Sequence, residues 1–334
     1  AAADANNTAG AVAALQQFNS AVYAQVVPSG EKAAERAALT SAARTLIDQL
    51  KGDSVDTSGT GITTSPWASV IRIFTEPTPF TPTPGATYKV LVNGHTRGFR
   101  HEHIVDTEAM VQQLGAANGF DVEIWDPNLG LGPGRQAPAG VVLTENPLLD
   151  LSKLMQYKTL VFASTVGTGA TGMTAAELAN LQAYIRAGGG FVAIHGATDS
   201  MQGTPWYMDL VGAGFTNHGG NAGGIMPDCG ACGEVELITA DPAHATTTHL
   251  PSRFTIHEEL YNTNRNPVEL GLVHPLVLEN ESSLVGQIGY NTGSLMNSDR
   301  HGMVWCRNFD GGRSFNTVIG HSWQLIHDSW YRQQ

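Results

Sequence analysis

The sequence predicts an α/β protein built around a mainly parallel sheet. From residue 88 onward, short apolar runs typical of buried strands alternate with segments of helical periodicity. One of these runs, residues 188–198, has a Gly-rich entry, a short apolar core and an abrupt turn of small residues, which is the pattern of a buried strand. Strands and helices that alternate at this spacing form βαβ units, whose strands lie parallel in one sheet.

The elements of this domain are expected in the following order. Strands are expected at residues 88–93, 120–125, 158–163 and 190–194, and helices at residues 102–114, 148–157 and 174–187. The Gly-rich, irregular stretch from residue 195 to residue 233 is expected to form a wall of the site. Further strands are expected at residues 235–238, 304–306 and 317–319, followed by a last helix near residues 322–331.

The N-terminal quarter of the chain has a different composition. Residues 9–50 are rich in Ala, Leu and Gln at helical spacing and are interrupted at Pro28-Ser29-Gly30, which predicts a helical hairpin. Residues 52–84 are rich in Thr, Ser, Gly and Pro, which predicts an extended linker. We therefore divide the chain into a helical hairpin with a Pro/Thr-rich linker, residues 1–84, and an α/β domain, residues 85–334.

The composition excludes several classes of partner. A net charge of -12 with only five lysines argues against binding to nucleic acid or to anionic membranes. No apolar run approaches the roughly 20 residues that a membrane-spanning helix needs. The chain starts at Ala1 with small residues and with neither an initiator Met nor a signal peptide. This start is typical of a secreted or periplasmic protein after cleavage, and a chain shortened in another way would start similarly.

The three cysteines fit an oxidising compartment. Cys229 and Cys232 form a CxxC pair, which is typical of a short disulfide, half of a zinc site or a redox pair. No second CxxC exists, and the pair lies in a Gly-rich loop rather than at a strand-to-helix turn. A local disulfide is therefore favoured, and Cys306 is expected to be a buried thiol on a strand.

The expected site lies at the carboxyl ends of the parallel strands. The loops after Asn93, Ala163 and Ile194 should project to the same edge of the sheet, where open α/β sheets bind ligands. His195 occupies the elbow after its strand, in the place where many hydrolases carry Ser or Cys. An imidazole titrates and binds metals but is an uncommon covalent nucleophile, so we expect acid–base or metal chemistry there.

Twelve histidines are a notable number for a chain so poor in lysine. Four of them are expected to hold a divalent metal such as zinc, with Glu259 as a candidate carboxylate ligand: His101, His195, His218 and His321. A three-ligand site would leave a position open to activate water or to polarise a sugar oxygen. The competing interpretation is that each ring hydrogen-bonds backbone in a tight loop.

That structural interpretation is preferred for the other histidines weighed: His95, His103, His249, His257, His274, His301 and His327. In His101-Glu102-His103, the one-residue spacing would splay the two rings apart on a helix, so only His101 is expected to face the site.

Other side chains are candidates for catalysis and substrate binding. His195, Glu259 and His101 are the expected catalytic residues, although Glu259 would equally fit a salt bridge at the rim. Arg100, Trp206, Tyr261 and Arg313 are the expected substrate-binding residues; ion pairing of the two arginines and packing of Trp206 are the alternatives. The Gly94–Gly98 loop is too weak a signal for a phosphate cradle, so no nucleotide cofactor is expected.

Several short motifs, taken in order, resemble the trehalose-utilisation (ThuA-like) family over roughly residues 88–330. They are Arg100-His101-Glu102, residues 190–197, Trp206, residues 210–215, His218, Asp241-Pro242-Ala243-His244, Leu250-Pro251, residues 258–261, Val304-Trp305, Gly311-Gly312-Arg313 and Gly320-His321. The resemblance implies a flavodoxin-like fold related to class I glutamine amidotransferases, with helices on both faces of the sheet and without the amidotransferase Cys. It implies carbohydrate metabolism as the setting. The family usually has a His directly after the Asp of its Asp-His-Pro motif, so a role for His244 is not expected.

These observations favour a secreted carbohydrate-active enzyme that is not a glutamine amidotransferase. It is expected to act on a sugar, glycoside or oxidised sugar by hydrolysis, elimination or isomerisation, with a small or polymeric carbohydrate as partner and a homo-oligomer as a further possibility. The alternative is a non-catalytic carbohydrate-binding module on a decayed amidotransferase-like site. A third hypothesis is an assembly role that uses the N-terminal hairpin.

Overall fold

The computed structural model describes residues 88–128, 141–218, 220–221, 232–285, 287–288, 300–322, 325–326 and 328–334. The helical hairpin and linker expected over residues 1–84 lie outside these ranges, as do Cys229 and His327. Within the described part, no helix is both long and apolar enough to cross a membrane.

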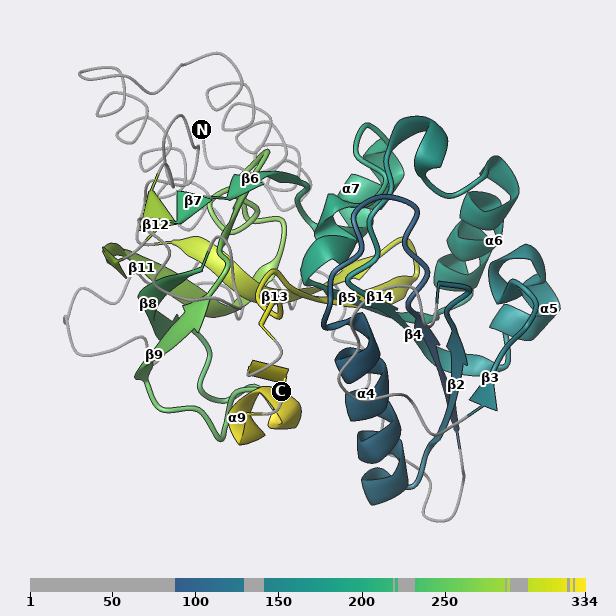
Figure 1. Cartoon of the computed structure of the whole chain (residues 1–334), viewed down its shortest axis with the longest axis horizontal. Coiled ribbons are helices and arrows are strands. Elements are labelled where there is room, and N and C mark those ends of the chain that lie inside the picture. The colour runs from purple at the N-terminus through teal and green to yellow at the C-terminus, as the bar shows by residue number, and fades with distance from the viewer. Residues whose placement is uncertain are drawn as a thin grey trace, which may run out of the picture.

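The described residues form an α/β fold around one large sheet (Figure 1). In chain order the elements are β1 (Lys89–Asn93), α4 (Ile104–Asn118), β2 (Asp121–Trp125), β3 (Val141–Val142), η1 (Pro147–Leu149), α5 (Leu151–Leu154), β4 (Tyr157–Ala163), η2 (Gly169–Thr171), α6 (Ala175–Arg186), β5 (Gly190–Ile194), η3 (His195–Asp199), α7 (Pro205–Val211), β6 (Phe215–His218), β7 (Gly220–Asn221), β8 (Gly233–Thr239), β9 (Arg253–Glu258), β10 (Tyr261–Thr263), β11 (His274–Val285), β12 (Gln287–Ile288), β13 (His301–Phe309), β14 (Gly312–Thr317) and α9 (Ser329–Gln333).

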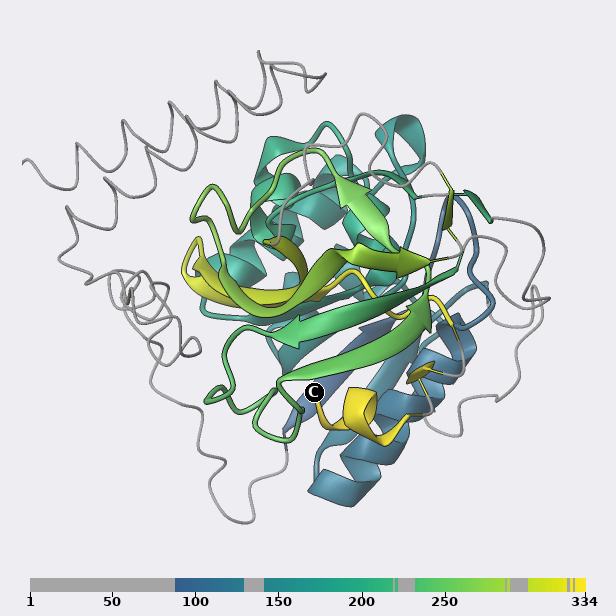
Figure 2. The same ribbon diagram turned by 90° about the vertical axis from the view of Figure 1, so that its left-hand side faces the viewer.

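The sheet has ten strands in the order β3-β2-β1-β4-β5-β14-β13-β11-β8-β9. The strands from β3 to β14 run parallel to one another, whereas the pairs from β14–β13 to β8–β9 are antiparallel. The sheet is therefore mixed, parallel in one half and antiparallel in the other. Figure 2 turns the antiparallel half toward the viewer, with α9 beneath it.

Alternate side chains of β1 pack into different parts of the core. Val90 and Val92 belong to a cluster that includes Met110 of α4, and this cluster continues into the antiparallel strands. Leu91, between them, belongs to a second cluster that includes Leu181 of α6. Because successive strand residues point to opposite sides of a sheet, the continuous apolar run of β1 is explained by burial on both sides.

The start of α6 is determined locally. Thr174 precedes the helix, and its hydroxyl accepts a hydrogen bond from the Glu177 backbone N–H at 3.3 Å. The Glu177 carboxylate in turn accepts from the Thr174 backbone N–H at 2.6 Å. This reciprocal capping box satisfies two N–H groups that a helix start would otherwise leave unpaired.

Some elements differ from the expectation. A strand was expected at residues 317–319, but the observed strand, β14, lies earlier in the chain and covers Gly312–Thr317. Strand β11, the longest, was not expected because its second half reads Glu-Asn-Glu-Ser-Ser, a polar run with no strand signal. The expected last helix is represented by α9, which begins only at Ser329, although residues 325–326 are also helical.

Candidate functional site

The strand β5 delivers His195 to the centre of the sheet's carboxyl edge. Ile194, the last residue of β5, pairs with Ala163 of β4 on one side and with Thr317 of β14 on the other. His195 follows with a φ of 46°, a left-handed conformation that is strained for a residue other than Gly. Its side chain is fully buried. The sequence therefore places an imidazole on a strained elbow inside the protein.

Three histidines and one carboxylate converge at this elbow. The rings of His101, His195 and His321 have centroids 5.0–5.4 Å apart. Glu259 Oε2 lies 3.2 Å from His195 Nε2 and 3.9 Å from His321 Nε2. One potential ligand atom from each of these four residues lies within 4.8 Å of all the others. The structure thus brings together three of the four histidines expected at a metal site, with Glu259 as the fourth group.

His103 also belongs to this group, so the expectation that only His101 faces the site is wrong. Its ring centroid lies 5.2 Å from that of His101 and 5.7 Å from that of His195. The helical geometry behind the expectation does not apply, because α4 begins only at Ile104 and residues 101–103 form the turn before it. The turn allows both rings to point the same way.

His218 and Tyr261 form the outer wall of the site. The short strands β6 and β10 pair antiparallel and place His218 opposite Tyr261. The buried Tyr261 ring lies over the His195 ring at a centroid distance of 4.2 Å. The exposed His218 has its Nε2 3.7 Å from Glu259 Oε1. Glu259 thus has one oxygen toward the buried imidazoles and the other toward a solvent-exposed one.

Burial controls the protonation of the cluster. It lowers the pKa of His321 to about 4 and holds the pKa of His101 and His103 well below its usual range. Burial acts to raise the pKa of Glu259, but the contact with His195 outweighs it and lowers that pKa to about 2 overall. Near neutral pH, His101, His103 and His321 are therefore neutral and Glu259 is ionised.

Two acidic residues near the site were not expected from the sequence. The buried Glu258 accepts hydrogen bonds from the backbone N–H groups of His321 at 2.7 Å and Glu259 at 3.1 Å. It therefore fixes the turn that carries His321. Asp199, at the end of η3, has a pKa raised to about 6 by burial. Glu258 could have been predicted from the sequence, because it is adjacent to the candidate Glu259. No local sequence feature indicates a role for Asp199.

Two of the expected substrate-binding residues lie away from the site. Arg313 pairs with Gly190 at the start of β5, and so belongs to the amino edge of the parallel strands, opposite His195. Trp206 donates from its indole Nε1 to Asp310 in the turn between β13 and β14, at that same edge. The expectation that Arg313 and Trp206 contact substrate is therefore wrong. Because β14 runs parallel to β5, its first residues lie at the edge opposite His195.

Arg100 lies at the carboxyl edge but is already engaged. Its guanidinium forms an ion pair with the buried carboxylate of Asp126 at 2.7 Å and donates to the carbonyl of Gly94 at 3.1 Å. These contacts are the structural ion pair that the sequence left open as an alternative.

Histidines outside the cluster have structural partners. His249 hydrogen-bonds the Trp330 carbonyl at 2.8 Å, His274 pairs with Asp241 at 2.7 Å, and His301 contacts the Tyr261 carbonyl at 3.0 Å. The expectation of structural roles fits these three histidines.

Cys306 is a free, half-buried cysteine on β13.

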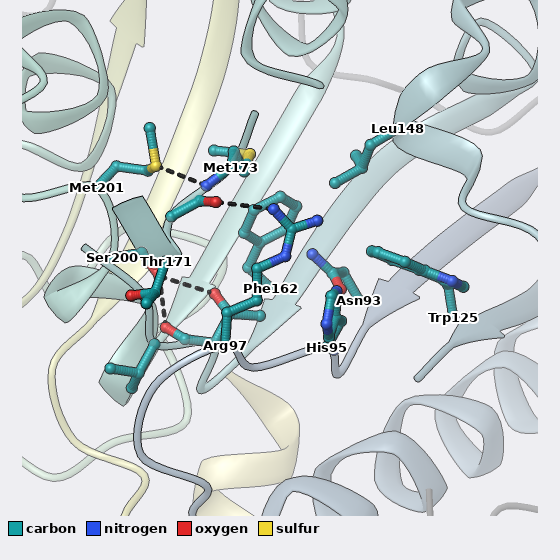
Figure 3. Close-up of a pocket in the computed structure, with 14 residues that line it drawn as sticks. Asn93, His95, Arg97, Trp125, Leu148, Phe162, Thr171, Met173, Ser200 and Met201 are labelled. Atoms are coloured by element: carbon teal, nitrogen blue, oxygen red, sulfur yellow. Dashed lines mark hydrogen bonds between the residues drawn. The ribbon is translucent and has the colours of Figure 1, made fainter. Parts of the chain in front are cut away.

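A pocket opens at the point where the strand order reverses, between β1 and β4 (Figure 3). Its space, counted together with the open mouth, is about 320 Å³, and it is lined by Asn93 at the end of β1, by His95 and Arg97 from the loop that follows and by Phe162 from β4, among others. Arg97 is held by Glu177 and by the Gly172 carbonyl at 2.7 Å. Ligands of open α/β sheets bind at such a reversal, so the pocket is a candidate extension of the site.

Comparisons with known proteins agree with this architecture. A family model described as ThuA, trehalose utilisation, matches residues 89–334. Among solved structures, the chain is similar to a putative ThuA-like protein from Bacteroides uniformis, with 17% identity and a TM-score of 0.53 over 77% of this chain and 91% of that one. A putative ThuA-like protein from Parabacteroides merdae has 17% identity and a TM-score of 0.46 over 71% and 80% of the two chains. No curated protein matches the chain.

Proposed function

The chain belongs to the ThuA family of trehalose utilisation, and on that premise we propose that it is a secreted carbohydrate-active enzyme. The family supports a carbohydrate-related role. The proposed substrate is a sugar, a glycoside or an oxidised sugar, and the proposed reaction is a hydrolysis, elimination or isomerisation driven by proton transfer. The observation that carries this proposal is the contact between Glu259 and His195 inside a buried group of imidazoles.

Each of the four side chains around this contact has a separate proposed task. Glu259 is the proposed general base, because one of its oxygens faces the exposed His218, which connects it to solvent. His195 lies beside this carboxylate in a fixed orientation, because its Nδ1 donates to the Val318 carbonyl at 2.7 Å. His101 supplies a neutral imidazole for a sugar oxygen. Tyr261 covers the His195 ring and keeps bulk water from it.

A divalent metal bound at these imidazoles would polarise a sugar oxygen or acidify a bound water. The sugar itself is proposed to approach along the carboxyl edge, from the side of His218, with part of it in the pocket between β1 and β4. Asp199 is a further candidate proton donor, because a carboxyl with a pKa of about 6 is partly protonated near neutral pH.

The test is turnover of a panel of sugars, glycosides and oxidised sugars by wild-type protein, His195→Ala and His249→Ala. We expect His195→Ala to lose at least about 100-fold in kcat/KM, while His249→Ala, which removes a histidine outside the cluster, keeps wild-type activity. Circular dichroism of both variants controls for folding. Full activity in a folded His195→Ala variant would contradict the proposal.

Measuring the binding of the same sugars to the same variants tests the alternative of a non-catalytic carbohydrate-binding module. Such a module would bind a sugar without converting it, and its affinity would survive loss of His195. The assignment of Trp206 as its stacking surface is not favoured, because the indole is hydrogen-bonded to Asp310 at the opposite edge of the sheet.

Secretion is proposed on the strength of the CxxC pair, Cys229 and Cys232. A disulfide between them would leave Cys306 as the one free thiol of the three cysteines in the sequence. Thiol titration of denatured protein, before and after reduction, should then count one thiol and three thiols. Three thiols before reduction would argue against an oxidising compartment.

A further inference from the structure

We propose that His101, His195, His321 and Glu259 bind one divalent transition-metal ion, of the zinc type, on the buried side of Glu259. The four residues come from three separate loops at the carboxyl edge and from the end of β9. Metal binding stands independently of the proposed function, and only the action of the ion on a sugar rests on it.

The first argument is the spacing of the donor atoms. In a tetrahedral zinc site with bonds of about 2.0–2.1 Å, neighbouring ligand atoms lie about 3.3 Å apart. Glu259 Oε2 lies 3.2 Å from His195 Nε2 and 3.9 Å from His321 Nε2. A nitrogen of His101 lies within 4.8 Å of the other donors. Small movements would therefore close the four donors around an ion.

The second argument is the hydrogen bonding of His195. The Val318 carbonyl, 2.7 Å from Nδ1, can only accept, so Nδ1 carries a proton. With Nδ1 engaged by Val318, Nε2 is the ring atom that faces the Glu259 carboxylate, at 3.2 Å, and these two atoms can bind one cation together. A ring N–H that donates to a backbone carbonyl is also the usual support of a metal-bound histidine.

The third argument is that two buried ring nitrogens of the cluster lack hydrogen-bond partners. Among the described residues, no group hydrogen-bonds His101 Nδ1 or His103 Nε2, although both atoms are buried. An unsatisfied buried donor or acceptor costs roughly 1–3 kcal/mol, so two in one cluster call for an explanation. His101 belongs to the four-residue set proposed to hold the ion, so its nitrogens are candidate ligand atoms.

The donor set selects the kind of ion. Three imidazoles and one carboxylate suit Zn²⁺ and its transition-metal neighbours, whereas Mg²⁺ and Ca²⁺ prefer sites made of oxygen. A second set of possible ligands, Cys232, Glu258 and His321, shares His321 with the first. It is less suitable because Glu258 already accepts backbone hydrogen bonds from Glu259, His321 and Ser322. His218 stays outside, on the other oxygen of Glu259.

The experiment measures zinc binding directly. Full-length protein is stripped with a chelator and dialysed, zinc affinity is measured by competition with a chromophoric chelator, and bound zinc is counted by elemental analysis. We expect one zinc ion per chain in wild type and in the control His249→Ala. His195→Ala and Glu259→Gln should bind at least about 100-fold more weakly. Replacement with Co²⁺ gives a visible absorption spectrum that reports nitrogen and oxygen ligands in low coordination number.

Glu259→Gln keeps the size of the side chain, so it remains informative if His195→Ala does not fold. Wild-type zinc affinity in a folded Glu259→Gln variant would overturn the inference, as would stripped wild-type protein that binds no stoichiometric zinc. The latter result would indicate an imidazolium–carboxylate ion pair instead. Stoichiometric zinc without sugar turnover would remove the proposed function alone, and turnover without zinc binding would remove this inference alone.

Discussion

Two polar clusters are buried at the carboxyl edge of this sheet, and they are completed in different ways. In the first, the Glu177 carboxylate accepts from both terminal nitrogens of Arg97, from the Asn146 amide at 2.5 Å and from the Thr174 backbone at 2.6 Å. In the second, the imidazoles around His195 leave His101 Nδ1 and His103 Nε2 without partners among the described residues.

The difference separates structure from function. A buried charge that has all its hydrogen bonds supports the fold, here by joining the loop after β1 to the start of α6. A buried group of rings with hydrogen-bond partners missing costs stability and calls for an explanation, which the ion proposed above would provide. Removing a member of the first cluster should therefore affect folding, and removing a member of the second should affect ligand binding and turnover.

The largest effect is expected for Glu177→Ala. The change leaves the guanidinium of Arg97 half-buried without its carboxylate, which should lower the free energy of unfolding by roughly 3 kcal/mol. Urea denaturation measures this loss, and Glu234→Ala, which removes an exposed carboxylate from β8, should stay within about 0.5 kcal/mol of wild type. If both variants were equally stable, the first cluster would not be structural.

A smaller effect, on the second cluster, is expected for Glu258→Gln. Glu258 touches no ligand atom but holds the backbone of Glu259 and His321, so it is a positioning residue. We expect zinc affinity to fall by about 10- to 100-fold while circular dichroism is unchanged. Glu236→Gln, at a surface ion pair with Arg253, is the control and should bind zinc as wild type does.

The pH dependence of stability should also identify the first cluster. Burial acts to raise the pKa of Glu177, but the hydrogen bonds from Arg97 and Thr174 lower it from 4.5 to about 2. Because the folded-state pKa is the lower one, the stabilisation is complete above the unfolded-state pKa and is lost as the pH falls from about 4.5 toward 2. Unfolding free energies measured over this range should decrease less steeply for Glu177→Gln. An unchanged slope would show that Glu177 does not contribute.

The smallest effect is expected for Arg313→Ala and Trp206→Ala. Both residues lie at the amino edge of the sheet, so neither change should alter kcat/KM by more than about twofold. A larger loss in a folded variant would mean that the site extends through to that edge. The measurement uses the same substrate as the His195→Ala comparison.

Local pattern alone determined much of this molecule. The apolar run before His195 and the small residues after it predicted a buried strand with an imidazole at its carboxyl end, and β5 and His195 follow that prediction. The helix expected at residues 174–187 corresponds to α6, whose start is held by a capping box between residues three positions apart. These features depend on neighbours within a few residues, which the sequence displays directly.

Only the tertiary structure decided how the site is assembled. The strand β9 is the last of the sheet, four positions from β14, yet Glu258 at its end accepts a hydrogen bond from the His321 backbone. The antiparallel half must therefore fold back over the carboxyl edge to bring Glu259 to His195, 64 residues earlier in the chain. Strand order, direction and curvature are determined by contacts between distant segments, so local periodicity does not predict them. For the same reason, Arg313 lies at the edge opposite His195.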